Sequence, residues 1–135
     1  MNKNIKSIII LFAAIAIIAS CTKDSGKLPN ISFKTGGSYV SADKTVAKGE
    51  TIVIGINASK SEDKDVLKTF SATKSINGAN ATSFDQQTLS GGDADAYAKD
   101  FTIVVGTASL TEKYTFTVVN RDGLTNQVTL TLNVQ

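Results

Sequence analysis

The sequence predicts an all-β domain, an antiparallel sandwich of two sheets with about seven strands. Apolar residues recur at every second position in several segments, whereas no long segment shows the 3.6-residue spacing of a helix. The alternating segments are rich in threonine and β-branched residues, which favour strands. Turn residues separate these segments at short intervals, as is typical of a sandwich.

Four segments alternate clearly enough to predict strands with one buried face. In the third of them Tyr114, Phe116 and Val118 share one side, and threonines occupy the other. Asp122-Gly123 follows this segment and predicts a hairpin turn, because glycine readily adopts a positive φ. The four segments are Glu50–Asn57, Lys99–Gly106, Thr111–Asn120 and Asn126–Val134.

Weaker patterns predict the remaining strands. In one of them the alternation slips, because Leu67 and Phe70 share a face only if a β-bulge lies between them. The weaker strands are expected at Ile31–Phe33, Ser38–Ser41, Val66–Ile76 and around Thr82–Leu89.

Residues 1–20 have the three parts of a secretory signal peptide. Lys3 and Lys6 make the start positive, 12 apolar residues run from Ile8 to Ala19, and Ser20 adds a further small residue. As a helix the run would measure roughly 18 Å, too short for a hydrocarbon core of about 30 Å. It is therefore interpreted as a leader and not as a transmembrane helix.

Cys21 is the one cysteine of the chain and directly follows this leader. The segment Ile18-Ala19-Ser20-Cys21 resembles a bacterial lipobox, although isoleucine stands where leucine is usual. The resemblance implies cleavage before Cys21 and acylation of that residue, and two or three acyl chains hold a protein durably on a membrane. The alternative is an ordinary signal peptide followed by a free cysteine.

The chain is thus expected to have three regions: a lipoprotein signal peptide at 1–20, a polar flexible tether at 21–30 and one sandwich domain at 31–135. Loss of the leader removes two lysines and leaves 12 basic and 12 acidic residues, so the mature chain has no net charge. No nucleic-acid partner is expected from this balance.

Two stretches of the domain carry a family resemblance. Lys48-Gly49-Glu50-Thr51 leads into an alternating strand, and Lys113–Val118 precedes Asn120-Arg121-Asp122-Gly123. They resemble bacterial immunoglobulin-like modules, the polycystic-kidney-disease-like and fibronectin-III-like domains common in Bacteroidetes lipoproteins. The resemblance covers roughly residues 36–134, implies an immunoglobulin-like strand order A, B, C, C′, E, F, G, and carries no active site. It implies that Tyr114 is a buried tyrosine corner bonded to backbone.

Catalysis is not expected. The chain has no histidine, which excludes serine–histidine and cysteine–histidine nucleophile schemes. Acylation would also consume its one thiol. The same composition excludes a histidine-based zinc site, and no cofactor is expected apart from a candidate Ca²⁺ ion.

Acidic residues are concentrated in three of the predicted connections: Asp63 and Asp65 between strands B and C, Asp93 and Asp95 between C′ and E, and Asp122 between F and G. The expected strand order brings these three connections to one end of the sandwich. Converging carboxylates are ligands that Ca²⁺ takes, so this end is a candidate calcium site. The alternative is a set of solvated acids, neutralised by nearby Lys60, Lys64 and Arg121. The candidate ligands are Asp63, Asp65, Asp93, Asp95 and Asp122.

Strand A starts at this same end, so the lipid tether is expected to enter there and the opposite tip to face away from the membrane. The expected function is a lipid-anchored outer-membrane module, on the periplasmic or surface side, that binds another envelope protein. The alternative is an accessory glycan-binding lipoprotein of a polysaccharide-uptake system. Its candidate stacking residues are Tyr39 and Tyr97, either of which would otherwise cover a sheet edge.

Overall fold

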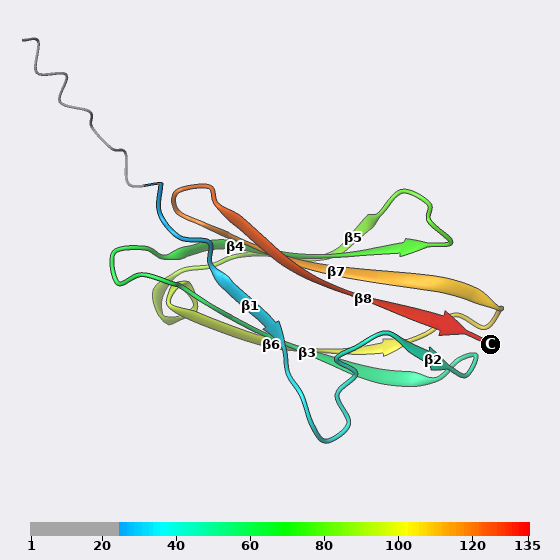
Figure 1. Cartoon of the computed structure of the whole chain (residues 1–135). Helices are drawn as coiled ribbons and strands as arrows, with labels where there is room; N and C mark the ends of the chain where they lie inside the picture. The colour runs from blue at the N-terminus through cyan, green and yellow to red at the C-terminus, as the bar shows by residue number, and fades with distance from the viewer. Residues whose placement is uncertain (1–24) are drawn as a thin grey trace, which may run out of the picture.

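The computed structural model describes residues 25–135, which form two β-sheets packed face to face (Figure 1). A three-stranded sheet has the order β1-β3-β6, and a five-stranded sheet has the order β2-β8-β7-β4-β5. Neighbouring strands are antiparallel except for β2 and β8. The elements are β1 (Asn30–Phe33), β2 (Lys44–Val46), β3 (Thr51–Ser59), β4 (Leu67–Ile76), β5 (Thr82–Thr88), the 3-10 helix η1 (Gly91–Ala94), β6 (Ala96–Val104), β7 (Leu110–Asn120) and β8 (Thr125–Val134).

This arrangement confirms the predicted immunoglobulin-like sandwich. The strands predicted as A, B and E are β1, β3 and β6 of one sheet, and C, C′, F and G are β4, β5, β7 and β8 of the other. Within the part of the chain that the structure describes, no helix is long and apolar enough to cross a membrane.

The connection between β1 and β3 differs from the prediction. The expected strand at Ser38–Ser41 is absent from the described fold, and only an isolated bridge joins Tyr39 to Val53. The next residues, expected to be a connection, form β2 beside the end of β8. Val46 of β2 is buried in the core. A strand of three residues is too short to display an alternating pattern, which explains why the sequence does not reveal it.

Two β-bulges set the direction of core side chains. Leu67 and Phe70 are both buried, and the register between β4 and β7 shifts next to Leu67, which confirms the predicted bulge. A second shift, between β4 and β5, leaves Phe84 without a partner. Its ring packs edge to face on Phe101 and Phe116, with centroid distances of 5.7 and 6.3 Å. The second bulge therefore turns Phe84 toward the edge of the core between β5 and β6, where its ring covers these aromatic side chains while remaining 43% exposed.

The predicted hairpin turn joins β7 to β8. Gly123 has a φ of 81°, and its N–H donates to the carbonyl of Asn120 at 3.1 Å. The N–H of Asn120 donates to the carbonyl of Leu124 at 3.0 Å and closes the turn. Both strands therefore enter the turn in register.

A carboxylate is buried inside the sandwich at the end where β7 begins. Glu112 is 0% exposed, and its Oε1 accepts from Lys74 Nζ and from the N–H of Gly106, each at 2.9 Å. Its Oε2 accepts from the hydroxyl of Tyr114 at 2.5 Å. Burial alone would raise the pKa of the Glu112 carboxyl, but these hydrogen bonds outweigh burial and lower it.

Tyr114 is buried as expected, but its hydroxyl bonds the Glu112 side chain and not backbone. The two residues lie two positions apart on the same face of β7, which brings the carboxylate within reach. Burial, and then the bond to Glu112, raise the pKa of the Tyr114 hydroxyl. The predicted tyrosine corner is thus replaced by a tyrosine–glutamate–lysine network.

Glu112→Gln should lower the free energy of unfolding at pH 7 by about 3 kcal/mol, because it removes the charge that Lys74 pairs with inside the fold. Since the folded-state pKa of Glu112 lies below its ordinary value of 4.5, its contribution is complete above that pH and is lost as the pH falls further. Urea denaturation of the wild type and the variant between pH 7 and pH 3 measures how the difference in their free energies of unfolding changes with pH. A stability difference that stays constant down to pH 3 would contradict the account.

Candidate functional site at the N-terminal pole

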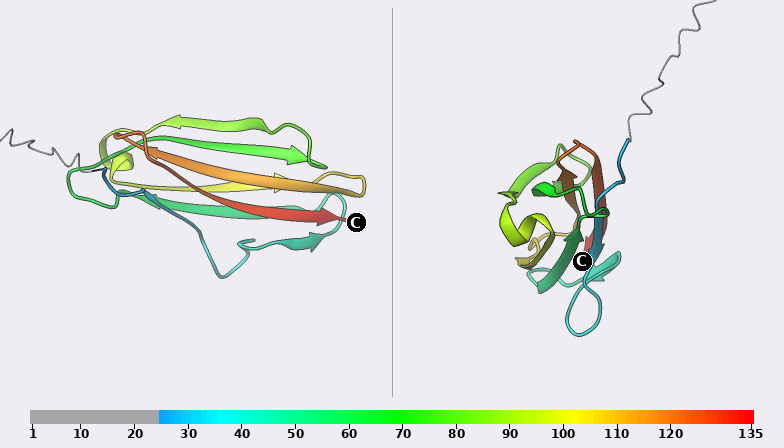
Figure 2. Two further views of the ribbon diagram at one scale, coloured as in Figure 1. Left: turned by 45° about the horizontal axis from the view of Figure 1, so that its top comes forward. Right: turned by 90° about the vertical axis from the view of Figure 1, so that its left-hand side faces the viewer.

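Three connections and the N-terminal segment meet at one end of the sandwich (Figure 2). Lys60 N–H donates to the carbonyl of Asp95 at 3.0 Å, and Arg121 N–H donates to the carbonyl of Val66 at 2.9 Å. These bonds confirm that the B–C, C′–E and F–G connections converge. We call this end, made of residues 25–29, 60–66, 89–95 and 121–124, the N-terminal pole. The opposite end, made of residues 43–49, 77–80 and 105–109, is the distal tip.

The backbone of residues 27–29 is fastened to this pole. The carbonyl of Pro29 accepts from Asn126 Nδ2 at 2.8 Å, and the hydroxyl of Ser61 donates to the carbonyl of Leu28. The N–H of Lys27 donates to Glu62 Oε2 at 3.2 Å. The ordered domain therefore starts before Ile31, where the flexible tether was expected to end. The sequence does not reveal this attachment, because residues 27–29 lie in a polar segment and their partners lie more than 30 residues away in the chain.

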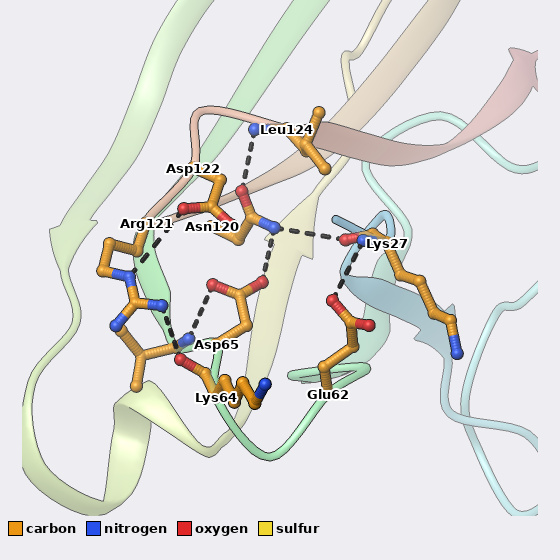
Figure 3. Close-up of polar contacts among 9 residues, drawn as sticks. Lys27, Glu62, Lys64, Asp65, Asn120, Arg121, Asp122 and Leu124 are labelled. Atoms are coloured by element: carbon orange, nitrogen blue, oxygen red, sulfur yellow. Dashed lines mark hydrogen bonds and ion pairs between the residues drawn. The ribbon is translucent and has the colours of Figure 1, made fainter. Parts of the chain in front are cut away.

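Asn120 is the centre of this pole (Figure 3). Its Nδ2 donates to Asp65 Oδ2 at 2.5 Å and to the carbonyl of Lys27 at 3.2 Å, and its Oδ1 accepts from the N–H of Leu124 at 2.8 Å. Asn120 and Asp65 are 0% and 2% exposed. One buried amide therefore joins the N-terminal segment, the β3–β4 loop and the β7–β8 turn. The sequence shows only an asparagine before a turn, so its two distant partners were not predicted.

Opposite charges alternate on the exposed part of the pole. Lys60 Nζ pairs with Asp95 at 2.8 Å, and its hydrogen bond to Asp95 raises the pKa of Lys60 although burial opposes the change. Arg121 Nη2 donates to the carbonyl of Lys64 at 2.5 Å. An open hollow of about 390 Å³ lies between the β3–β4 loop and the β7–β8 turn. Its rim carries both signs of charge, as expected for solvated loop residues.

The structure divides the five candidate calcium ligands into two groups. Asp63, Asp65 and Asp122 line the hollow, whereas Asp93 lies in η1 and Asp95 directly follows it. Asp65 is bonded to Asn120, and Asp95 is paired with Lys60. In residues 25–135 no three histidine, cysteine, aspartate or glutamate side chains form a group that could hold a metal ion. The calcium site stays a prediction for which this pole offers no set of ligands.

The two candidate stacking tyrosines have different surroundings. Tyr97 is only 9% exposed and packs on Phe70 with a centroid distance of 5.0 Å, so its ring offers no platform and the stacking prediction for it is wrong. Its inward register on β6 places it in the core. Tyr39 lies partly exposed on the outer side of the three-stranded sheet. The predicted signal peptide and Cys21 lie outside the described residues.

Comparisons with known proteins support the fold. No protein-family profile and no curated protein matches the sequence. The solved structure of a superoxide reductase (neelaredoxin) from Ignicoccus hospitalis has a TM-score of 0.54 at 10% identity over 81% of each chain. The CARDB domain of a Pyrococcus furiosus protein, solved in complex with di-metal ions, has a TM-score of 0.52 at 15% identity, covering 82% of this chain and 91% of that domain. The chain is similar to these β-folds in architecture alone.

Asn120→Asp should loosen the N-terminal pole, because a second carboxylate would face Asp65 and the donor to Lys27 would be lost. We expect the free energy of unfolding at pH 7 to fall by about 3 kcal/mol. Amide hydrogen exchange at residues 27–30 should become faster. Urea denaturation and exchange mass spectrometry measure the two effects.

The matched control is Asn80→Asp, which makes the same chemical change at an exposed position of the distal tip. It should leave both measurements close to those of the wild type. If Asn120→Asp were no more disruptive than this control, Asn120 would not hold the pole together.

Proposed function

We propose that the chain is a lipid-anchored, non-catalytic module of the bacterial outer membrane that binds another envelope protein through its distal tip. The fastening of residues 27–29 to one pole carries this proposal, because it gives an anchor at Cys21 a defined direction relative to the sandwich. The lipobox resemblance at Cys21 and the likeness to modules of Bacteroidetes lipoproteins support it.

The distance between anchor and domain limits how the protein would sit on a membrane. Lys27 lies six positions after Cys21 in the chain, and a fully extended chain advances about 3.3–3.6 Å per residue. An acylated Cys21 would thus keep the N-terminal pole within roughly 20 Å of the lipid surface. The distal tip, at the far end of the long axis in Figure 2, would then point away from the membrane.

The distal tip has the surface that a protein contact needs. Ile76 is 42% exposed and Val104 is 64% exposed, and both end strands that run toward this tip. Lys44 and Lys48 of the distal tip are also exposed, and so is Lys113 in the first half of β7. Apolar centres with a charged rim are common in protein interfaces. We therefore expect the partner to present an apolar patch bordered by acidic residues.

Site-specific photo-crosslinking in intact cells of the native bacterium tests the proposal. A crosslinker at Ile76 should give one prominent envelope-protein adduct, whereas a crosslinker at Lys64 of the N-terminal pole should not. Cys21→Ser should move the protein out of the membrane fraction and abolish the adduct. The proposal fails if Cys21→Ser leaves the protein membrane-bound, or if Lys64 gives the adduct as strongly as Ile76.

A further inference from the structure

The outer face of the three-stranded sheet carries a second, separate hollow. It measures about 270 Å³ and lies near the N-terminal pole. The residues of its floor stand side by side in two rows across the strands, Ser32 beside Asn57 and Ala98, and Asn30 beside Ser59 and Ala96. The rows offer amides and hydroxyls separated by methyl groups, with no charged side chain in the lining.

An aromatic ring lies farther along the same face. Gly55 precedes Asn57 by two positions, and a Cβ on Gly55 would be 2.7 Å from Tyr39 Cε1, so this edge of the ring lies against the backbone of β3. Lys34 Nζ lies over the ring, 5.7 Å from its centroid. The hydroxyl of Tyr39 donates to Asp100 Oδ2 at 2.9 Å, and Lys34 Nζ pairs with Asp100 Oδ1 at 2.7 Å. Two residues of a strand span about 6.6–6.8 Å, so the part of β3 that the Tyr39 ring contacts lies about that distance from Asn57 in the hollow.

The lining restricts the chemistry of a ligand. No charged side chain lines the hollow, and Lys34, farther along the same face, is already paired with Asp100, so the hollow offers no positive charge for a nucleic acid. The backbone of β3 is paired on both sides, by β1 and by β6, so a peptide strand could add only at the edges of this sheet and not across the floor of the hollow. The amide of Asn57 and the hydroxyl of Ser32 project from an uncharged floor. These features suit a neutral ligand rich in hydroxyl groups.

The geometry points to a binding site for a neutral saccharide on the outer face of β1, β3 and β6. Asn57, Ser32 and Ser59 hydrogen-bond sugar hydroxyls, for which amides and hydroxyls supply both donors and acceptors. The small alanine side chains allow a sugar ring to approach the sheet, and the Tyr39 ring packs on the C–H face of a neighbouring unit. The site needs neither the lipid anchor nor the protein contact at the distal tip.

Affinity gel electrophoresis tests this with the full chain, purified in a detergent that has no sugar headgroup. The probes are soluble neutral polysaccharides, namely a β-glucan, an arabinoxylan, a galactomannan and starch, with acidic polygalacturonate for comparison. We expect at least one neutral polymer to retard the protein. Ala98→Gln, which fills the hollow, and Tyr39→Leu, which removes the ring, should each weaken the retardation at least tenfold.

One variant serves as the matched control. Thr102→Gln adds the same side chain on the same face of β6 but outside the hollow. It should be retarded like the wild type, and urea denaturation verifies that all three variants fold.

The inference is overturned if no neutral polymer retards the protein, if polygalacturonate alone does, or if Ala98→Gln is retarded as strongly as Thr102→Gln. Retardation without an adduct from Ile76 would count against the proposed protein contact and leave the saccharide site standing. An adduct without retardation would count against the saccharide site and leave the proposed protein contact standing.

Discussion

The hydrogen bonds of the buried Asn120 amide decide how the chain enters its sandwich. Asp65 is buried next to loops that carry further acids, and a neutral amide is the group that bonds it without adding charge. The same amide holds the carbonyl of Lys27, so the N-terminal segment is part of the polar interior and not a loose end. The direction of the molecule relative to its N-terminus depends on this contact.

The other end of the sandwich is closed by a second buried network that also contains a carboxylate. There Lys74, Tyr114 and a backbone N–H surround the Glu112 carboxylate. Between the two networks the core is apolar and aromatic, with Phe70, Phe101 and Phe116 in contact. Each end is thus tied across several strands and loops by buried polar groups whose hydrogen bonds are satisfied.

The parts that sequence reasoning predicted are those governed by local patterns. Alternation revealed β3, β6, β7 and β8, and even the slip between Leu67 and Phe70 indicated a real bulge. Contacts between distant residues were not predictable, such as the one from Asn120 to a carbonyl 93 positions away. The inward position of Glu112 did carry a signal, because it shares a face with Tyr114 and Phe116. A carboxylate at such a position is buried stably only because three donors bond it, and these donors come from other parts of the chain or of the strand.

The orientation of the sandwich is the central claim, and the depth of spin labels in liposomes tests it most directly. Acylation of Cys21 would leave a cysteine introduced at Asp122 or at Asn77 as the one free thiol of the lipidated protein. The account predicts that a label at Asp122, in the N-terminal pole, lies close to the lipid surface, while a label at Asn77, in the distal tip, lies far from it. Equal distances, or a label at Asn77 closer to the bilayer, would contradict the account.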